Sequence, residues 1–321
     1  VTVDVLGDLI VEIDETFTVD LTAPLFSGAG DATRLAISDD SGLGTILNDD
    51  TTAISIDDVA VAEGDTGTTA FTFTISTDLL SSKDLGVTVN THDLLEAVGG
   101  TDYTSIVNQP AVIVAGTNST TVTVDVLGDL IVEIDETFTV DLTAPLFDSA
   151  ADATRVTISD DSGLGTILND DTAAISINDV AVAEGDSGTT AFTFTISSSL
   201  QASKDLGVTV NTHDLLEAVA GTDYTAIVNQ TAVIAAGTNS TTVTLDVLGD
   251  LIVEIDETFT VDLTAPIFDG AADATRVAIS DDSGLGTILN DDTAAISIND
   301  VAVAEGDSCL LYTSPSPRDA R

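Results

Sequence analysis

The stretch that decides the fold is VLGDLIVEIDETFTVDLTAP, residues 126–145, which also occurs at residues 5–24 and 247–266. Around its acidic centre, Thr121–Leu127 and Thr137–Thr143 alternate apolar and polar side chains. This period of two residues is typical of half-buried β-strands. The stretch is therefore predicted to form a β-hairpin.

The predicted turn of this hairpin is crowded with acid, because Asp129, Glu133, Asp135 and Glu136 fall within eight residues. Carboxylates so close together repel one another unless a cation lies among them. A hard divalent cation that prefers oxygen ligands, above all calcium, fits this chemistry. The alternative is a solvated acidic loop that protects the sheet from edge pairing, and for one copy alone it is the simpler interpretation.

The composition narrows the choice of partners and fold. The chain of 321 residues has a net charge of −48, which disfavours nucleic acid and anionic membrane surfaces as partners. A hydrophobic content of 43% argues against disorder. The apolar residues are mostly Val, Ile, Leu and Ala set among Thr, which favours β-structure. No apolar run is long enough for a membrane span.

Internal repetition sets the domain organisation. Residues 51–171 align without a gap with residues 172–292 and differ at 15 of 121 positions. Each block is large enough to fold as an independent domain. The predicted parts are the end of one domain (1–50), two full domains (51–171 and 172–292), the start of another (293–308) and a tail outside the repeat (309–321).

The strand pattern within a unit predicts an all-β, two-sheet antiparallel sandwich. The predicted strands of the first full unit are Ala53–Ile56 with Val59–Ala62 as one broken strand, Ala70–Ser76, Gly86–Thr91, Ala111–Val114, Thr120–Leu127, Thr137–Thr143 and Gly165–Leu168. A polar loop is expected between the last two strands. In such a sandwich, four acidic segments that are distant in sequence can share one pole.

The two ends of the chain call for separate interpretations. The chain has no Met and opens within a predicted strand, so we expect it to be an internal piece of a longer protein. Cys309 is the single cysteine, and cysteine-free tandem β-repeats suit a bacterial secreted or cell-surface protein. Residues 309–321 break the repeat in mid-strand and resemble a translated sequencing-adapter read-through, so we interpret them as an artefact.

Four motifs in fixed order give the unit a family resemblance. They are Val61-Ala62-Glu63-Gly64-Asp65, Gly100-Thr101-Asp102-Tyr103, Asp129 to Phe138, and Gly165 to Asp171. Together they resemble the Calx-beta domain, found in sodium–calcium exchangers and in many bacterial surface repeat proteins. The resemblance implies tandem seven-stranded immunoglobulin-like β-sandwiches that bind calcium at one end.

The resemblance also implies a set of calcium ligands in each full unit. In the first unit they are Glu63, Asp102, Asp129, the carbonyl of Ile131, Glu133, Glu136, Asp170 and Asp171. In the second they are Glu184, Asp223, Asp250, the carbonyl of Ile252, Glu254, Glu257, Asp291 and Asp292. Gly128 and Asn169 depart from the family, because its best calcium-binding members have Asp at these places. The other acids, such as Asp148, Asp152, Asp160 and Asp161, are interpreted as surface charge.

Signals of catalysis are weak. Asp65-Thr66-Gly67 matches the aspartic-protease tripeptide, but that dyad needs two such loops across one cleft, so a plain turn is the better interpretation. His92 and His213 have no Cys or second His nearby in the sequence and are expected to be loop residues. We therefore expect no enzyme in this chain.

Two hypotheses of function follow. The first is a calcium-rigidified stalk or adhesive array in a secreted or cell-surface protein. Its partners would be calcium ions, neighbouring Calx-beta domains of the same chain and an extracellular ligand that the sequence does not identify. The alternative is a calcium-sensing regulatory module attached to a transporter or enzyme outside this segment. Near-identical tandem copies favour the stalk, because a sensor needs only one or two domains.

Overall fold

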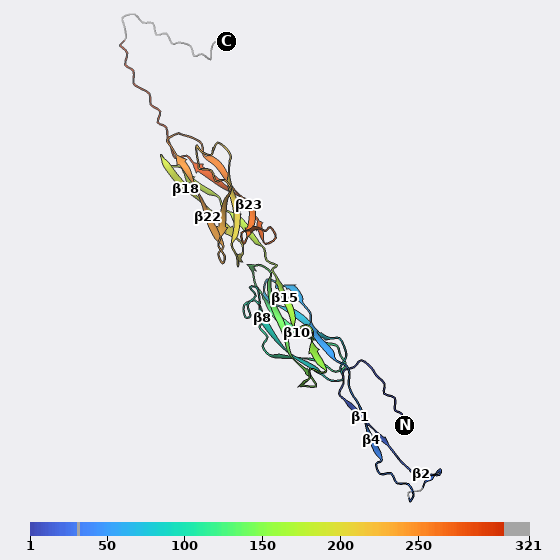
Figure 1. Cartoon of the computed structure of the whole chain (residues 1–321). Helices are drawn as coiled ribbons and strands as arrows, with labels where there is room; N and C mark the ends of the chain where they lie inside the picture. Colours follow the sequence, from blue (N-terminus) through green and yellow to red (C-terminus); the bar gives the residue numbers. More distant parts are fainter. Residues whose placement is uncertain (31–32, 305–321) are drawn as a thin grey trace, which may run out of the picture.

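The computed structural model describes residues 1–30 and 33–304, and these form β-strands and connecting loops without any helix. The two full repeat units are β-sandwiches that lie end to end, with residues 1–50 continuing the line beyond the first of them (Figure 1). No helix among these residues could cross a membrane. The predicted tail, residues 309–321, lies outside the described part of the chain.

The first 50 residues form two pairs of strands. β1 pairs with β4 in antiparallel register, and a short β2–β3 pair lies beyond them (Figure 1). The bounds are β1 Glu15–Asp20, β2 Leu25–Phe26, β3 Ala29–Gly30 and β4 Ser41–Ile46.

The first full unit has two sheets, with strand orders β10-β7-β5-β14 and β6-β15-β12-β8-β9, and β13 pairs with β12. Its strands are β5 Thr52–Ile56, β6 Val59–Ala62, β7 Gly67–Thr77, β8 Leu85–Asp93, β9 Gln109–Ile113, β10 Ser119–Gly128, β11 Ile131–Val132, β12 Glu136–Phe147, β13 Ala150–Ala151, β14 Val156–Ile158 and β15 Ser162–Leu168.

The second full unit repeats this arrangement, with orders β22-β18-β16-β25 and β17-β26-β23-β20-β21. Its strands are β16 Ala173–Ile177, β17 Val180–Ala183, β18 Gly188–Ser198, β19 Gln201–Ala202, β20 Leu206–Asp214, β21 Gln230–Ile234, β22 Ser240–Gly249, β23 Glu257–Phe268, β24 Ala271–Ala272, β25 Val277–Ile279 and β26 Ser283–Leu289. The predicted all-β sandwich fold is confirmed.

The core of each sandwich is built from the alternating apolar faces of its two sheets. In the first full unit, Phe71 and Phe73 of β7 pack near Phe138 of β12, and the ring of Tyr103 stacks on Phe138 at a centroid distance of 4.4 Å. Gly165 of β15 makes room for this ring, because a Cβ there would lie 2.4 Å from Cζ of Phe138. The aromatic cluster therefore anchors the strands that carry the acidic segments.

The prediction of a β-hairpin in residues 121–143 is wrong. β10 pairs with β7 in one sheet, whereas β12 pairs with β8 and β15 in the other. The chain between them crosses from one sheet to the other, and we call residues 129–135 the acidic loop. Alternation showed correctly that both strands are half-buried, but it carries no information about which strand is the hydrogen-bonded partner.

The expected polar loop between β12 and β15 also needs correction. It contains β14, which pairs in parallel with β5, and β6 pairs in parallel with β15, so the sheets are not purely antiparallel. The predicted break in the first strand is confirmed, since β5 and β6 belong to different sheets. The carboxylates of Asp57 and Asp58 stabilise the crossing by accepting bonds from the amides of Thr74 (2.6 Å) and Leu164 (2.8 Å).

Candidate metal centre

Seven carboxylates of the first full unit gather at the end of the sandwich that faces the second unit, and we call this end the acidic pole. They come from four places: the turn after β6, the loop before Tyr103, the acidic loop with the start of β12, and the segment after β15. Its members are Glu63, Asp102, Asp129, Glu133, Glu136, Asp170 and Asp171.

Mutual electrostatic effects show that these groups are neighbours. Burial raises the pKa of Glu63 to about 8, and Glu133, Asp129 and Asp170 reinforce the rise. Burial likewise raises the pKa of Glu136 to about 8, with Asp102 and Glu133 adding to it. The pKa of Glu133 rises to about 7, first through burial and then through Asp129 and Asp102. Segments far apart in sequence therefore share one electrostatic site.

Two of these carboxylates are buried with an oxygen that nothing among the described residues satisfies. Glu136 and Asp171 are each 5% exposed, and Oε2 of Glu136 and Oδ2 of Asp171 have no hydrogen-bond partner there. Burying an oxygen anion without a donor or cation costs free energy. A cation with oxygen ligands removes that cost, so the residues present fit a metal such as calcium.

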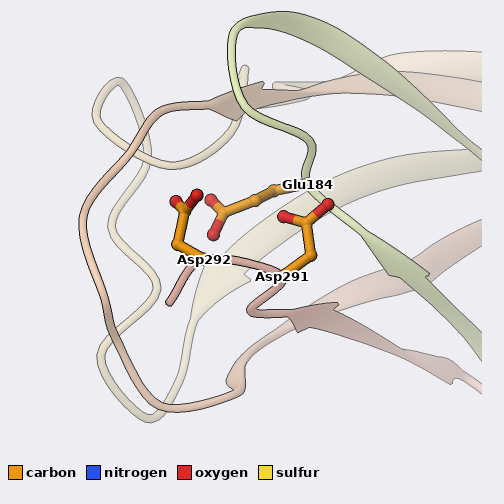
Figure 2. A group of neighbouring side chains, drawn as sticks. All are labelled: Glu184, Asp291 and Asp292. Carbon is orange, nitrogen blue, oxygen red and sulfur yellow. The ribbon is translucent and has the colours of Figure 1, made fainter. Parts of the chain in front are cut away.

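The acidic pole of the second full unit has the same construction. Figure 2 shows the side chains of Glu184, Asp291 and Asp292 converging, and one carboxylate oxygen from each lies within 4.8 Å of the others. Burial raises the pKa of Glu184 to about 7, with Glu254 and Asp250 adding to it. Oδ2 of Asp292 is again buried without a partner among the described residues.

The remaining predicted residues of this second pole behave as their counterparts do. Burial, followed by the charges of Asp223, Glu254 and Glu184, raises the pKa of Glu257 to about 7. The carboxylate of Asp223 accepts the Val219 amide at 2.7 Å, and that of Asp250 accepts the Ile252 amide at 2.6 Å. Ile131 lies on the acidic loop and Ile252 on its counterpart in the second unit, residues 250–256. The role of their carbonyl oxygens as ligands stays a prediction.

Both departures from the family pattern have a structural reason. A Cβ on Gly128 would lie 1.9 Å from the carbonyl oxygen of Gly64, so an aspartate does not fit this backbone. Asn169 braces the pole, because Oδ1 accepts the Glu133 amide at 2.8 Å and Nδ2 donates to the Asp171 carbonyl at 2.9 Å. An aspartate could make the first bond but not the second.

The sequence analysis missed one acidic member of the pole and misplaced the histidines. Glu96 contributes to the raised pKa values of Glu133 and Glu136, but its position after β8 gave no sign of this contact. His92 and His213 were expected in loops and instead lie on β8 and β20. Nδ1 of His92 is 2.5 Å from Oδ2 of Asp141. Asp152, interpreted as surface charge, is held by Thr154 and Arg155, which lower its pKa to about 2.

The fold and the two acidic poles define a class of protein: tandem β-sandwiches with a cluster of carboxylates at one end of each. The model of the Calx-beta domain matches residues 1–41, 48–162 and 169–292. The chain belongs to the Calx-beta domain family, as the motifs indicated. A search of curated proteins found no match.

Solved structures of Calx proteins are among the similar folds. The crystal structure of CBD12 from CALX1.2 has 14% identity and a TM-score of 0.34, covering 74% of this chain and 99% of that one. The calcium binding domain CBD12 of CALX1.1 has 16% identity and a TM-score of 0.34, covering 73% and 98%. The apo form of the Calx CBD1 domain has 21% identity and a TM-score of 0.31, covering 38% and 100%.

Proposed function

We propose that the acidic pole of each unit binds calcium and that the calcium-loaded units form a stiff stalk or adhesive array. The observation that carries the proposal is the pair of buried carboxylate oxygens on Glu136 and Asp171 that lack a hydrogen-bond partner among the described residues. A merely solvated acidic surface would leave such oxygens in water.

The residues that would hold the ion are the carboxylates of the acidic pole with the carbonyl of Ile131, and their counterparts in the second unit. The ion supplies positive charge where the first full unit carries 21 acidic and two basic residues. Asn169 and the amide of Gly64, which donates to Asp170 at 3.3 Å, hold the loops in place around the site. These residues orient the carboxylates toward a shared centre.

The location of the pole links calcium to stiffness. Thr172 begins the second full unit directly after Asp170 and Asp171, and the acidic loop contacts that unit through β11, which pairs with β19. Without a cation the carboxylates repel one another, so the acidic end of the junction is held less rigidly even while Val132 stays packed in the second unit. With calcium held between them, the two segments that join the units are tied to one centre.

We place this segment in a secreted or cell-surface protein, on the strength of its acidity and its cysteine-free repeats. A calcium-sensing module beside a transporter or enzyme remains the second candidate of the sequence analysis. The sequence of the complete protein distinguishes the two: a secretion signal with many more copies supports the stalk, and membrane spans support the sensor.

Two measurements on the chain test the proposal. Calcium bound only by the folded state raises the melting temperature, by the mass-action relation RT ln(1 + [Ca]/Kd). Melting curves that are identical in chelator and in millimolar calcium would refute the metal site. Small-angle scattering should show an extended rod in calcium and a broader ensemble in chelator. If calcium stabilises the fold but scattering does not change, the metal site stands and the stalk mechanism fails.

A further inference from the structure

The acidic loop carries apolar side chains that are buried by the following unit rather than by its own. Val132 is 0% exposed and belongs to the hydrophobic core of the second full unit, and Ile134 packs against the same core. Val11, one repeat earlier, is also 0% exposed and belongs to the core of the first full unit. The same side chain therefore enters the next domain at both junctions.

The backbone joins the two units at the same place. Val132 pairs in parallel with Ala202, and its carbonyl accepts the amide of Ser203 at 3.0 Å. At the earlier junction, the amide of Val11 donates to the Leu80 carbonyl at 2.9 Å, and the Ser82 amide donates to the Val11 carbonyl at 2.9 Å. The acidic loop thus adds the short strand β11 to the unit that follows it, and its counterpart around Val11 makes an isolated β-bridge with Ser81 of the first full unit.

An arginine of the following unit holds the base of the loop. Nε of Arg276 donates to the Glu133 carbonyl at 2.8 Å, and Nη2 pairs with Asp135 at 2.9 Å. Its remaining terminal nitrogen pairs with Asp273 at 3.0 Å. The guanidinium also lies over the ring of Phe268, 5.7 Å from its centroid.

The earlier junction has the same arginine contact, and a lysine adds another charge pair at the later one. Arg155 donates through Nε to the Glu12 carbonyl at 2.8 Å and pairs with Asp14 at 3.0 Å. Lys204 pairs with Glu96 of the preceding unit at 2.8 Å. Three of the seven basic residues of a strongly acidic chain therefore reach across a junction.

A second copy of the acidic loop, without a unit after it, shows what buries the apolar side chains of the first. Residues 250–257 have the same sequence as residues 129–136, but no following sandwich covers them in the described part of the chain. There Val253 is 51% exposed, against 0% for Val132, and Ile255 is 53% exposed, whereas its counterpart Ile134 packs against the core of the second unit. Because the local sequence is identical, the neighbouring unit must cause the burial.

We propose that the acidic loop is a plug that docks into a socket at the opposite pole of another repeat unit of this kind, and that the exposed loop 250–256 is the docking surface for such a unit. The socket consists of the segment around β19, Lys204 and the Asp273–Arg276 pair. The interface is head-to-tail, because the plug and the socket lie at opposite ends of a unit, and so it propagates in one direction. It rests on packing and hydrogen bonds and does not depend on the calcium proposal.

The energetic dependence across the interface also runs in one direction along the chain. Val132 contributes to the core of the unit after it, so the stability of that unit depends on its predecessor. The first unit gains no equivalent side chain from the second, since its own plug residue, Val11, comes from residues 1–50. A defect in one plug should therefore weaken the following unit.

The test compares Val132→Asp with Val253→Asp in the full chain, because the two residues have the same local sequence and differ in the docked neighbour. Val132→Asp places a charge in the core of the second unit, so we expect its unfolding midpoint to fall by about 10 °C. Val253→Asp should leave all midpoints within about 2 °C, as for a surface substitution. Equal effects of the two substitutions would overturn the proposal.

Hydrogen exchange gives a local readout that survives a failure of Val132→Asp to fold. Peptides around Ser203 differ in sequence from those around Ser82, so the two sockets can be followed separately. The milder Val132→Ala should speed exchange of the Ser203 amide at least tenfold in chelator and in calcium alike, while Val253→Ala should not. Unchanged protection of Ser203 in Val132→Ala would overturn the proposal even if calcium binding is intact.

Discussion

Replacing Glu136 by Gln should change the stability of the chain in opposite directions with and without calcium. Glu136 is buried at the start of β12, one of its oxygens has no hydrogen-bond partner among the described residues, and its pKa is raised to about 8. Gln has nearly the same shape and no charge. The substitution therefore removes both the buried anion and a candidate ligand, and these two losses have opposite consequences.

In chelator the substitution should stabilise the fold. The folded state holds a proton on Glu136 up to about pH 8 and the unfolded state only to about 4.5, so above pH 8 the full cost of ionisation is present. At about 1.4 kcal/mol per pKa unit, the rise sets a ceiling near 5 kcal/mol. Relaxation of the loop and entry of water reduce this, and we expect a gain of about 1–2 kcal/mol at pH 8.5.

In calcium the same substitution should destabilise the fold. Calcium at 100 times its Kd contributes about 2.7 kcal/mol to a folded state that binds one ion. A variant that has lost a charged ligand forfeits much of that contribution in the first full unit, while the second unit keeps its own site. The expected signature is a crossing: the variant is more stable than the parent in chelator and less stable in calcium.

Urea denaturation at pH 8.5, in EDTA and in 5 mM calcium, measures both arms, and titration calorimetry measures the loss of bound ions. Asp161→Asn is the matched control, because Asp161 is an exposed carboxylate directly before β15, at the end of that strand away from the pole. It should shift neither arm by more than about 0.5 kcal/mol. Equal stability of Glu136→Gln and the parent in EDTA, or unchanged calcium binding, would show that our account of the buried carboxylate is mistaken.

Further predictions concern pH and the two departures from the family pattern. In chelator, stability should fall as pH rises from about 4.5 to 8, because groups such as Glu63 hold a proton over this range only in the folded state; a flat urea-midpoint profile would contradict this. Asn169→Asp should cost about 1–3 kcal/mol in chelator, because it removes the donor to the Asp171 carbonyl; an unchanged midpoint would argue against the brace. Gly128→Ala should cost about 3 kcal/mol or more through its clash with Gly64, whereas Gly7→Ala, its counterpart in open space, should be neutral by the same assay.

The sequence by itself determined the class of fold and the ingredients of the site. A repeat of 121 residues set the unit, and alternation placed Phe71, Phe73 and Phe138 on core-facing strands, as the structure confirms. These properties are local or periodic, so they can be read from neighbouring positions along the chain. The four acidic motifs and their order were enough to indicate the family that the domain model then matched.

The tertiary structure decided which elements meet. Residues 121–143 looked like a hairpin because two alternating strands follow one another, yet β10 and β12 belong to different sheets. β14 was hidden in a polar stretch, because its parallel partner β5 lies about one hundred residues away. Strand pairing depends on long-range geometry, and alternation with a period of two does not indicate which strands pair.

Only the tertiary structure could also assign the acidic loop its second role. Val132 and Val253 have the same neighbours in sequence, yet one is in a core and the other is half exposed. The carboxylates of the loop allowed a metal site to be predicted from the sequence, because their mutual repulsion follows from their closeness along the chain. The valine between them gave no such sign, since its burial is created by a domain whose socket lies about seventy residues further along the chain.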